Sequence, residues 1–280
     1  MPSVAIVTSP AASIPPDLIQ RYAIHLVPFT IQFVDGNVRD STDVDNVEFY
    51  QRLTTEYVVP NTNPPSPAQF LQTFRQIEAD VVIVFHISAM ISKSFEHANL
   101  AAQRIPERRI VNIDTTSVSL GIGLQVIAAA EDLAAGYDVD AVLERAYARV
   151  NHVLAITVPE SVRFLRLSGR LKLLPGMIAS FFGIIPVLSI QRGSVVLLER
   201  ARSHEAALDT MIRHIQNFVA DHHVHSLGIS HTQAPALAEQ LKRRLQPEFP
   251  ALPLLINDAG PVLAVHIGPG AIALTALREL

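Results

Sequence analysis

The sequence predicts an α/β fold in two parts, with a parallel sheet in the first part and a mixed sheet in the second. Three observations support this prediction. The first half alternates apolar strands with amphipathic helices, which is the pattern of a parallel sheet with helices on its faces. Residues 81–84 are a continuous apolar run, as in a strand that is covered on both faces. The second half contains a hairpin pattern, which adds antiparallel strands.

The first half supplies the elements of the parallel sheet in order. Apolar runs predict strands at 3–8, 80–87 and 109–114. Helical spacing predicts helices at 46–57, from 66 onward, at 95–105, at 119–135 and from 138 onward. The helix after 66 has the clearest start, because Ser66 suits the N-cap, Pro67 the first helical position and Gln69 the closing residue of a capping box.

The second half supplies the mixed sheet. Strands are predicted at 153–158, 225–230, 254–258, 261–266 and 271–277, and helices at 203–220 and 235–245. Residues 187–199 predict a hairpin that turns at Arg192 and Gly193. We place the boundary between an N-terminal α/β domain, residues 1–155, and a C-terminal mixed domain, residues 156–280.

The composition narrows the function. Apolar residues make up 49% of the chain and charged residues 17%, so either much surface is buried or an apolar ligand is held. The net charge of −4 gives no reason to expect nucleic-acid binding. The chain has no cysteine, which excludes disulfides, thiolate metal sites and a cysteine nucleophile.

Residues 173–191 carry no charge and come close to the length of a membrane span. Pro175, Gly176, Gly183 and Pro186 interrupt this stretch, so we expect no transmembrane helix. The first ten residues lack the basic region of a signal peptide. We therefore expect a cytoplasmic protein.

Three serines, Ser88, Ser92 and Ser94, follow the second predicted strand of the parallel sheet. Ligands of such sheets sit beyond the carboxyl ends of the strands. No Gly-x-Ser-x-Gly or Ser-x-x-Lys motif is present, so the serines are better interpreted as hydrogen-bond donors than as nucleophiles. Ser92 or Ser94 would also cap the next helix, and a helix N-terminus with hydroxyls suits an anion.

Two further patterns favour structural roles. Gly121 and Gly123 lack the third glycine of a dinucleotide fingerprint, so close helix packing is the better explanation. His223 and His225 alternate as a metal pair would, but no third ligand is apparent, and surface histidines are favoured. We therefore predict no metal site.

A basic cluster, formed by Arg163, Arg166, Arg170 and Lys172, directly precedes the charge-free stretch. A solvated helix face is the default interpretation of such a cluster. Its junction with an apolar segment would also suit an anionic amphiphile. His266 lies beside a Gly-Pro-Gly turn, where both a structural and a binding role stay open.

Seven motifs occur in order along nearly the whole chain, at residues 60–67, 87–95, 113–123, 168–171, 184–188, 201–203 and 260–270. In order and spacing they resemble the motifs of the DegV family, the bacterial fatty-acid-binding proteins. The resemblance implies two α/β domains with a long-chain fatty acid between them. It also implies a fatty acid kinase as partner, no cofactor other than the bound lipid, and no catalytic residue in this chain.

The resemblance also assigns residues. It implies that Thr62 and Ser92 bind the carboxylate together with His266. Arg170 and Arg202 would meet the headgroup, its phosphate or the kinase. The acyl-chain lining would include Met177, Phe181, Phe182 and Ile184.

Five departures from the family motifs affect this assignment, at Ser9, Pro64, Lys93, Ile185 and Ile267. They leave the kinase partnership open. One alternative is a substrate subunit like that of dihydroxyacetone kinase, with a small ketone held covalently on His266. Another is a carrier of a different amphiphile without any kinase. Chain length, saturation and oligomeric state are not set by the sequence.

Overall fold

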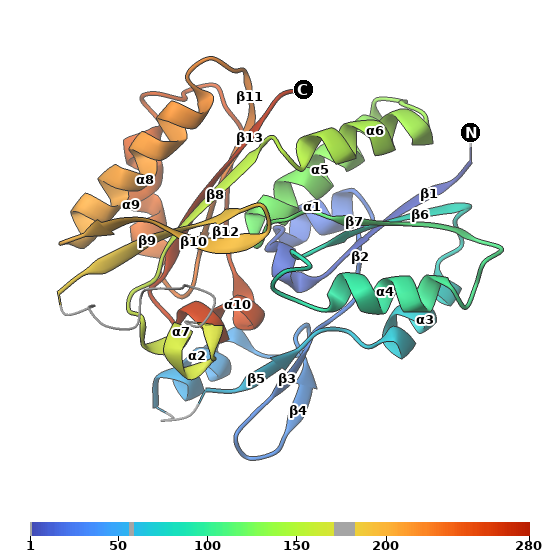
Figure 1. Cartoon of the computed structure of the whole chain (residues 1–280), viewed down its shortest axis with the longest axis horizontal. Coiled ribbons are helices and arrows are strands. Elements are labelled where there is room, and N and C mark those ends of the chain that lie inside the picture. The colour runs from blue at the N-terminus through green and yellow to red at the C-terminus, as the bar shows by residue number, and fades with distance from the viewer. Residues whose placement is uncertain (1, 56–58, 171–182) are drawn as a thin grey trace.

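The computed structural model describes residues 2–55, 59–170 and 183–280. Figure 1 shows a large sheet and a smaller one side by side, with a third, short sheet below them. The smaller of these two is a parallel sheet ordered β2-β1-β6-β7, and the larger is a mixed sheet ordered β10-β9-β8-β13-β11-β12. The predicted α/β fold class is therefore confirmed.

The parallel sheet is covered on both faces. Its strands are β1 (Val4–Thr8), β2 (His25–Leu26), β6 (Val81–His86) and β7 (Arg109–Asp114). On one face lie α5 (Leu120–Ala134) and α6 (Val139–Arg149), and on the other α3 (Pro67–Gln76) and α4 (Ser94–Ala102). Successive residues of β6 point to opposite faces, so Ile83 packs in the first core and Val82 and Val84 in the second.

The mixed sheet packs on α8 (His204–Val219) and α9 (Pro235–Leu245). Its strands are β8 (Val153–Val158), β9 (Ile185–Gln191), β10 (Ser194–Ala201), β11 (Val224–His231), β12 (Leu254–Asp258) and β13 (Ile272–Arg278). Strands β9 and β10 form the predicted hairpin, which turns at Arg192 and Gly193 as expected.

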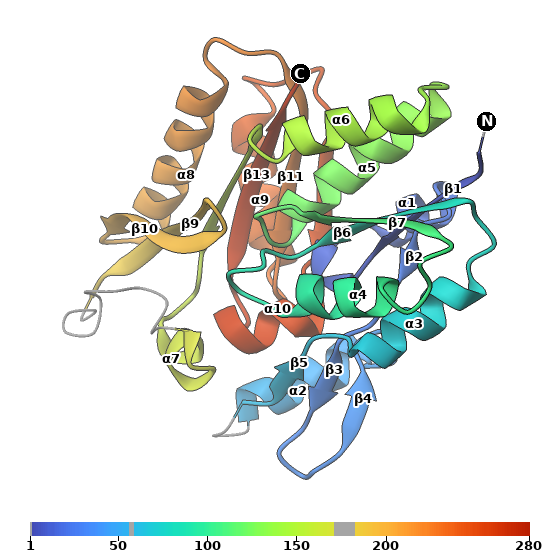
Figure 2. The same ribbon diagram turned by 45° about the vertical axis from the view of Figure 1, so that its right-hand side comes forward.

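Helix α5 lies between the two large sheets (Figure 2). Ile122 and Val126 belong to the core of the parallel sheet, whereas Leu124 and Ala128 pack against residues of the mixed sheet. A Cβ atom at Gly123 would come within 2.5 Å of the Ala12 carbonyl oxygen. The glycines of this helix therefore serve close packing, as the sequence predicted.

The short third sheet is ordered β4-β3-β5. Its strands are β3 (Thr30–Gln32), β4 (Val38–Asp40) and β5 (Asn61–Asn63). Around it lie α2 (Asn46–Thr55), α7 (Arg163–Leu167) and α10 (Gly260–Ile267), which share a core that includes Phe49, Phe164 and Val265. A short 3-10 helix (Pro10–Ala12) and α1 (Pro16–Arg21) complete the described elements. Residues distant in sequence thus meet beside β5.

The prediction of a strand at 261–266 was wrong, because these residues form α10. A short apolar run does not distinguish a buried strand from a buried helix. Pro261 supplies a fixed φ near the helix start, and Gly268, at φ 77°, follows the last helical residue.

The described helix α2 ends at Thr55, and α4 runs from Ser94 to Ala102 rather than from 95 to 105. No helix within residues 2–55, 59–170 and 183–280 is long and apolar enough to span a membrane. The domain limits 1–155 and 156–280 stay a prediction.

Candidate functional site

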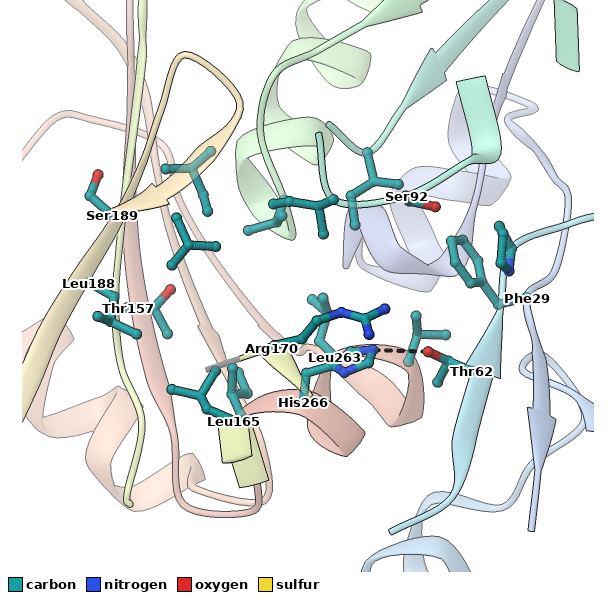
Figure 3. Close-up of a pocket in the computed structure, with 18 of the residues that line it drawn as sticks. Phe29, Thr62, Ser92, Thr157, Leu165, Arg170, Leu188, Ser189, Leu263 and His266 are labelled. Atoms are coloured by element: carbon teal, nitrogen blue, oxygen red, sulfur yellow. Dashed lines mark hydrogen bonds between the residues drawn. The ribbon is translucent and has the colours of Figure 1, made fainter. Parts of the chain in front are cut away.

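A cavity of about 250 Å³ lies where the three sheets meet (Figure 3). Its parallel-sheet side is formed by loops that follow β6 and β7, and its mixed-sheet side by β8, β9 and β10. The short sheet contributes β5, and α10 closes the remaining side. The cavity therefore sits at the carboxyl ends of the parallel strands, where a ligand of such a sheet is expected.

Most of the described lining is apolar. The apolar residues are Phe29, Pro64, Ile87, Ile91, Val118, Leu165, Leu188, Ile190, Val195, Val262, Leu263 and Ile267. Polar side chains are Thr62, Ser92, Lys93, Thr157, Arg170, Ser189 and His266. Two are cations, and the described lining includes no aspartate or glutamate. The wall therefore offers positive charge to an anion and apolar surface to a tail.

Thr62 and His266 form a polar pair in this wall. The hydroxyl oxygen of Thr62, on β5, lies 2.9 Å from Nε2 of His266, on α10 (Figure 3). The other ring nitrogen, Nδ1, is buried and has no hydrogen-bond partner within the described residues. Because one ring nitrogen must be the donor and the other the acceptor in neutral imidazole, the Thr62 bond and the ring tautomer are linked.

The His266 ring is neutral near pH 7. Burial lowers the pKa of His266, and the nearby positive charge of Arg170 lowers it further, to about 3. A buried cation would be costly here, so the folded protein disfavours the protonated imidazole. The ring therefore stays neutral at pH values where an exposed histidine would be protonated. His266 is thus a hydrogen-bonding group rather than a counter-ion, and positive charge in the described wall comes from Arg170 and Lys93.

Arg170 points its guanidinium toward the Thr62–His266 pair (Figure 3). Its only described protein partner is the Ser168 carbonyl, which accepts a hydrogen bond from Nη1 at 3.2 Å. No carboxylate of the described residues pairs with it. Within the described residues most donors of this half-buried guanidinium are unused, so it is prepared to receive a planar anion.

The three serines after β6 have three different positions. Ser88 is fully buried and its hydroxyl donates to the Gly193 carbonyl of the β9–β10 hairpin, at 2.7 Å. Ser94 is also buried and hydrogen-bonds Nδ1 of His86 at 3.1 Å. Ser92 is half-buried, lines the cavity and accepts a long bond of 3.3 Å from the Ser94 amide. Its hydroxyl proton is therefore available to a ligand.

Four residues that the sequence singled out share this cavity, namely Thr62, Ser92, Arg170 and His266. Arg202 does not, because it is exposed just after β10. Ile184 is half-buried directly before β9 and is absent from the described lining. Met177, Phe181 and Phe182 lie outside the described residues.

Several lining residues were not anticipated. They are Phe29, Leu165, Leu188, Val195, Val262 and Leu263, together with the hydroxyl residues Thr157 and Ser189. Each is an ordinary apolar or strand residue in its own segment. Their role arises only from the meeting of three sheets, which no local pattern encodes.

Within the histidine pattern at 222–225, His225 on β11 joins the mixed sheet to α5. His225 contacts the Glu131 carboxylate of α5, with Nε2 3.3 Å from the carboxylate oxygen. This contact and a hydrogen bond from Tyr22 help to lower the pKa of Glu131. The described part of the chain contains no cluster of side chains that would hold a metal ion.

The chain matches a family model along almost its full length. The model is that of the DegV family, described as uncharacterised proteins, and it matches residues 3–279. A DegV domain-containing protein of Deinococcus radiodurans is 30% identical over 283 residues, covering 99% of each chain. Another, from Caldanaerobacter subterraneus, is 27% identical over 97% of each chain.

Two solved structures of DegV proteins also resemble this chain. A DegV family protein from Thermus thermophilus, described as fatty acid binding, is 25% identical with a TM-score of 0.89, covering 99% of this chain and 100% of its own. A Bacillus subtilis protein, described as a fatty acid binding DegV, shares the fold with a TM-score of 0.91 at 20% identity, covering 100% of both chains.

Proposed function

The chain belongs to the DegV family, and we propose that it binds a long-chain fatty acid. The carboxylate is held at the Thr62, Ser92 and Arg170 end of the cavity, and the acyl chain is covered by the apolar lining. The observation that carries this proposal is the cavity itself, whose described wall is apolar, carries hydroxyls and two cations, and includes no carboxylate. The fatty acid binding described for the Thermus thermophilus relative supports it.

The headgroup needs partners because an unpaired buried carboxylate is very costly. Ser92 offers a hydroxyl proton, and Arg170 offers a charge-assisted, bidentate partner. Thr62 donates to the carboxylate when Nε2–H of His266 donates to the Thr62 oxygen. In that tautomer Nδ1, which has no partner among the described residues, is an acceptor, and His266 positions Thr62 rather than pairing with the ligand's charge.

The tail supplies most of the binding free energy. Burying each methylene is worth roughly 0.8 kcal/mol, so a long acyl chain gains on the order of 10 kcal/mol before ordering costs. An apolar wall of this kind favours an acyl chain over a small ketone. No described residue is required to act as acid, base or nucleophile in this function.

Presentation of the acid to a fatty acid kinase is the finer part of the proposal. Arg202 is exposed beside the end of β10, where it would meet a phosphate or a protein partner. Three of the five departures from the family motifs, Pro64, Lys93 and Ile267, line the cavity. Lys93 adds a cation beside Ser92, so the headgroup environment of this chain is more positive than the family motif implies. A cytoplasmic location stays part of the same prediction.

Binding of hexadecanoic acid and of its methyl ester to the lipid-free protein tests the proposal. Thr62→Val combined with Ser92→Ala should weaken binding of the acid at least about 100-fold, because hydrogen bonds to a charged group contribute about 1.5–3 kcal/mol each. The affinity for the methyl ester, which carries no charge, should fall much less. Fluorescence competition measures both dissociation constants.

Ser189→Ala is the matched control. Ser189 lines the same cavity, but its hydroxyl already donates to the Ala155 carbonyl at 2.8 Å. This variant should bind the acid like the wild type. Unchanged affinity of the double variant for the acid, or preference of the wild type for the ester, would remove the proposed headgroup site.

A further inference from the structure

Thr157 places a hydroxyl in the apolar part of the cavity wall. It lies on β8, paired with Leu188 of β9, and it lines the cavity. Figure 3 shows it among the mixed-sheet side chains, across the cavity from Thr62. Within the described residues its hydroxyl forms no hydrogen bond, although Ser189 on the adjacent strand has one to the Ala155 carbonyl.

This arrangement is unusual for a site that would hold only a saturated tail. The described lining around Thr157 on this side includes Leu165, Leu188 and Val195. An alkyl chain laid over Thr157 would remove water from the hydroxyl and offer it no hydrogen bond. A buried polar group without a partner is unfavourable. A valine of the same shape would serve a saturated tail better.

A trapped water molecule is a poor substitute partner. Buried waters typically make about three hydrogen bonds to polar groups. On this side of the described wall the other hydroxyl is that of Ser189, whose proton is already given to Ala155. A polar atom of the ligand itself satisfies Thr157 more completely, because it is positioned by the chain that carries it.

We propose that the acid this protein selects carries a hydroxyl group on its acyl chain, which Thr157 binds on the mixed-sheet side of the cavity. The ligand class is a long-chain hydroxy acid. A ligand hydroxyl both donates and accepts, so it pairs with the Thr157 hydroxyl in either direction. The inference rests on the proposed function, since the same ligand places its carboxylate at Thr62 and Ser92.

The test compares hexadecanoic acid with the positional isomers of monohydroxyhexadecanoic acid on the lipid-free full-length protein, by competition against a fluorescent fatty acid. In the wild type, at least one isomer should bind more tightly than hexadecanoic acid. Thr157→Val should reverse this preference, changing the ratio of the two dissociation constants about tenfold, or 1.4 kcal/mol. The position of the favoured hydroxyl then reports how far Thr157 lies along the bound chain.

Two variants separate the hydroxyl from general packing. Thr157→Ser keeps the hydroxyl and should keep the preference, and Ser189→Ala should leave the ratio unchanged. If hexadecanoic acid binds and Thr157→Val alters no isomer's ratio, the hydroxy-acid inference is wrong while the proposed function stands. If neither acid binds the wild type, both are overturned.

Discussion

At the scale of single residues, the site depends on the neutrality of His266. The ring is buried and forms a hydrogen bond with Thr62, and the positive charge of Arg170 disfavours its protonation. A charged imidazole would place a second positive group beside Arg170 in a dry wall. The neutral ring instead orients Thr62 and leaves the Arg170 guanidinium for an anion.

Protonation of His266 should make stability depend on pH. The pKa of this ring is about 3 in the folded protein against an ordinary value of 6.5. Below about pH 6.5 the unfolded chain binds a proton at this position and the folded chain does not. The contribution of the neutral His266 ring to the free energy of unfolding is therefore complete above pH 6.5. It is lost progressively as the pH falls toward 3, by at most about 1.4 kcal/mol per pH unit.

Urea unfolding at two pH values checks this sign. Between pH 7 and pH 5, at roughly 1.4 kcal/mol per unit below 6.5, the wild type should lose about 2 kcal/mol more than His266→Gln. Identical losses in the wild type and His266→Gln would show that this ring is not neutral and buried in solution.

The residues of the headgroup site were predictable to different degrees. Thr62, Ser92, Arg170 and His266 came from motif resemblance, and the structure brings all four to one cavity. Their binding roles stay predictions. Thr157 carried no signal, because a threonine in a β-strand is an ordinary strand residue.

At the scale of elements, the β9–β10 hairpin connects the mixed sheet to the loop after β6. The Gly193 carbonyl at its tip accepts the Ser88 hydroxyl, and Met90 of that loop lies against the same glycine. Ile190 and Val195, on either side of the turn, line the cavity. The position of the hairpin tip therefore determines one wall of the site.

Gly193→Ala should loosen this wall. Gly193 has φ 80°, and a Cβ atom there would lie 2.7 Å from the Ser88 hydroxyl oxygen, so the serine would have to rotate and lose its bond. Gly136 has a similar φ of 87° with open space around it. Gly136→Ala should cost about 1–2 kcal/mol of unfolding free energy from backbone strain alone, and Gly193→Ala about 1 kcal/mol more.

The rate of ligand release is a second measurement that compares Gly193→Ala with Gly136→Ala. Gly193→Ala should speed the dissociation of a bound fluorescent fatty acid, because loss of the Ser88 hydrogen bond frees the hairpin tip that carries Ile190 and Val195. Gly136→Ala should leave the rate unchanged. Equal destabilisation and equal release rates for the two variants would show that the hairpin contact has no part in closing the cavity.

Elements with strong periodicity or clear caps were predictable from the sequence, and others were not. The capping box at Ser66 and Gln69 is present at the start of α3, as the sequence predicted. The strands β2 to β5 have only two or three residues each, too few for any alternation to be recognised. The strand predicted at 261–266 became α10, and it is this helix that carries His266 to Thr62.

At the scale of the whole molecule, polar contacts join segments that are far apart in the chain. The Ser119 hydroxyl donates to Ser230 at 2.7 Å and lies 3.0 Å from the Ser13 hydroxyl. Tyr50 donates to the Asp258 carboxylate at 2.6 Å, and burial together with this carboxylate raises the pKa of Tyr50. These bonds hold the three sheets around one cavity.

The assembly of the sheets could be expected from the sequence only in outline. Strand–helix alternation predicted the parallel sheet, and the hairpin predicted antiparallel strands beside it. The contacts between the sheets include isolated serines, such as Ser13 and Ser119, whose hydrogen-bond partners are more than a hundred residues away. Both serines have a φ of 53°. Such pairs leave no periodic signal, so the cavity between the sheets required coordinates.

The most direct measurement is the identity of the molecule that the purified protein carries. Organic extraction followed by mass spectrometry should recover about one long-chain acid per chain from the wild type. The Thr62→Val, Ser92→Ala double variant, folded with a normal melting curve, should yield almost none. Absence of an acid from the wild type, or equal amounts of acid in both proteins, would contradict the account of a carboxylate held at this end of the cavity.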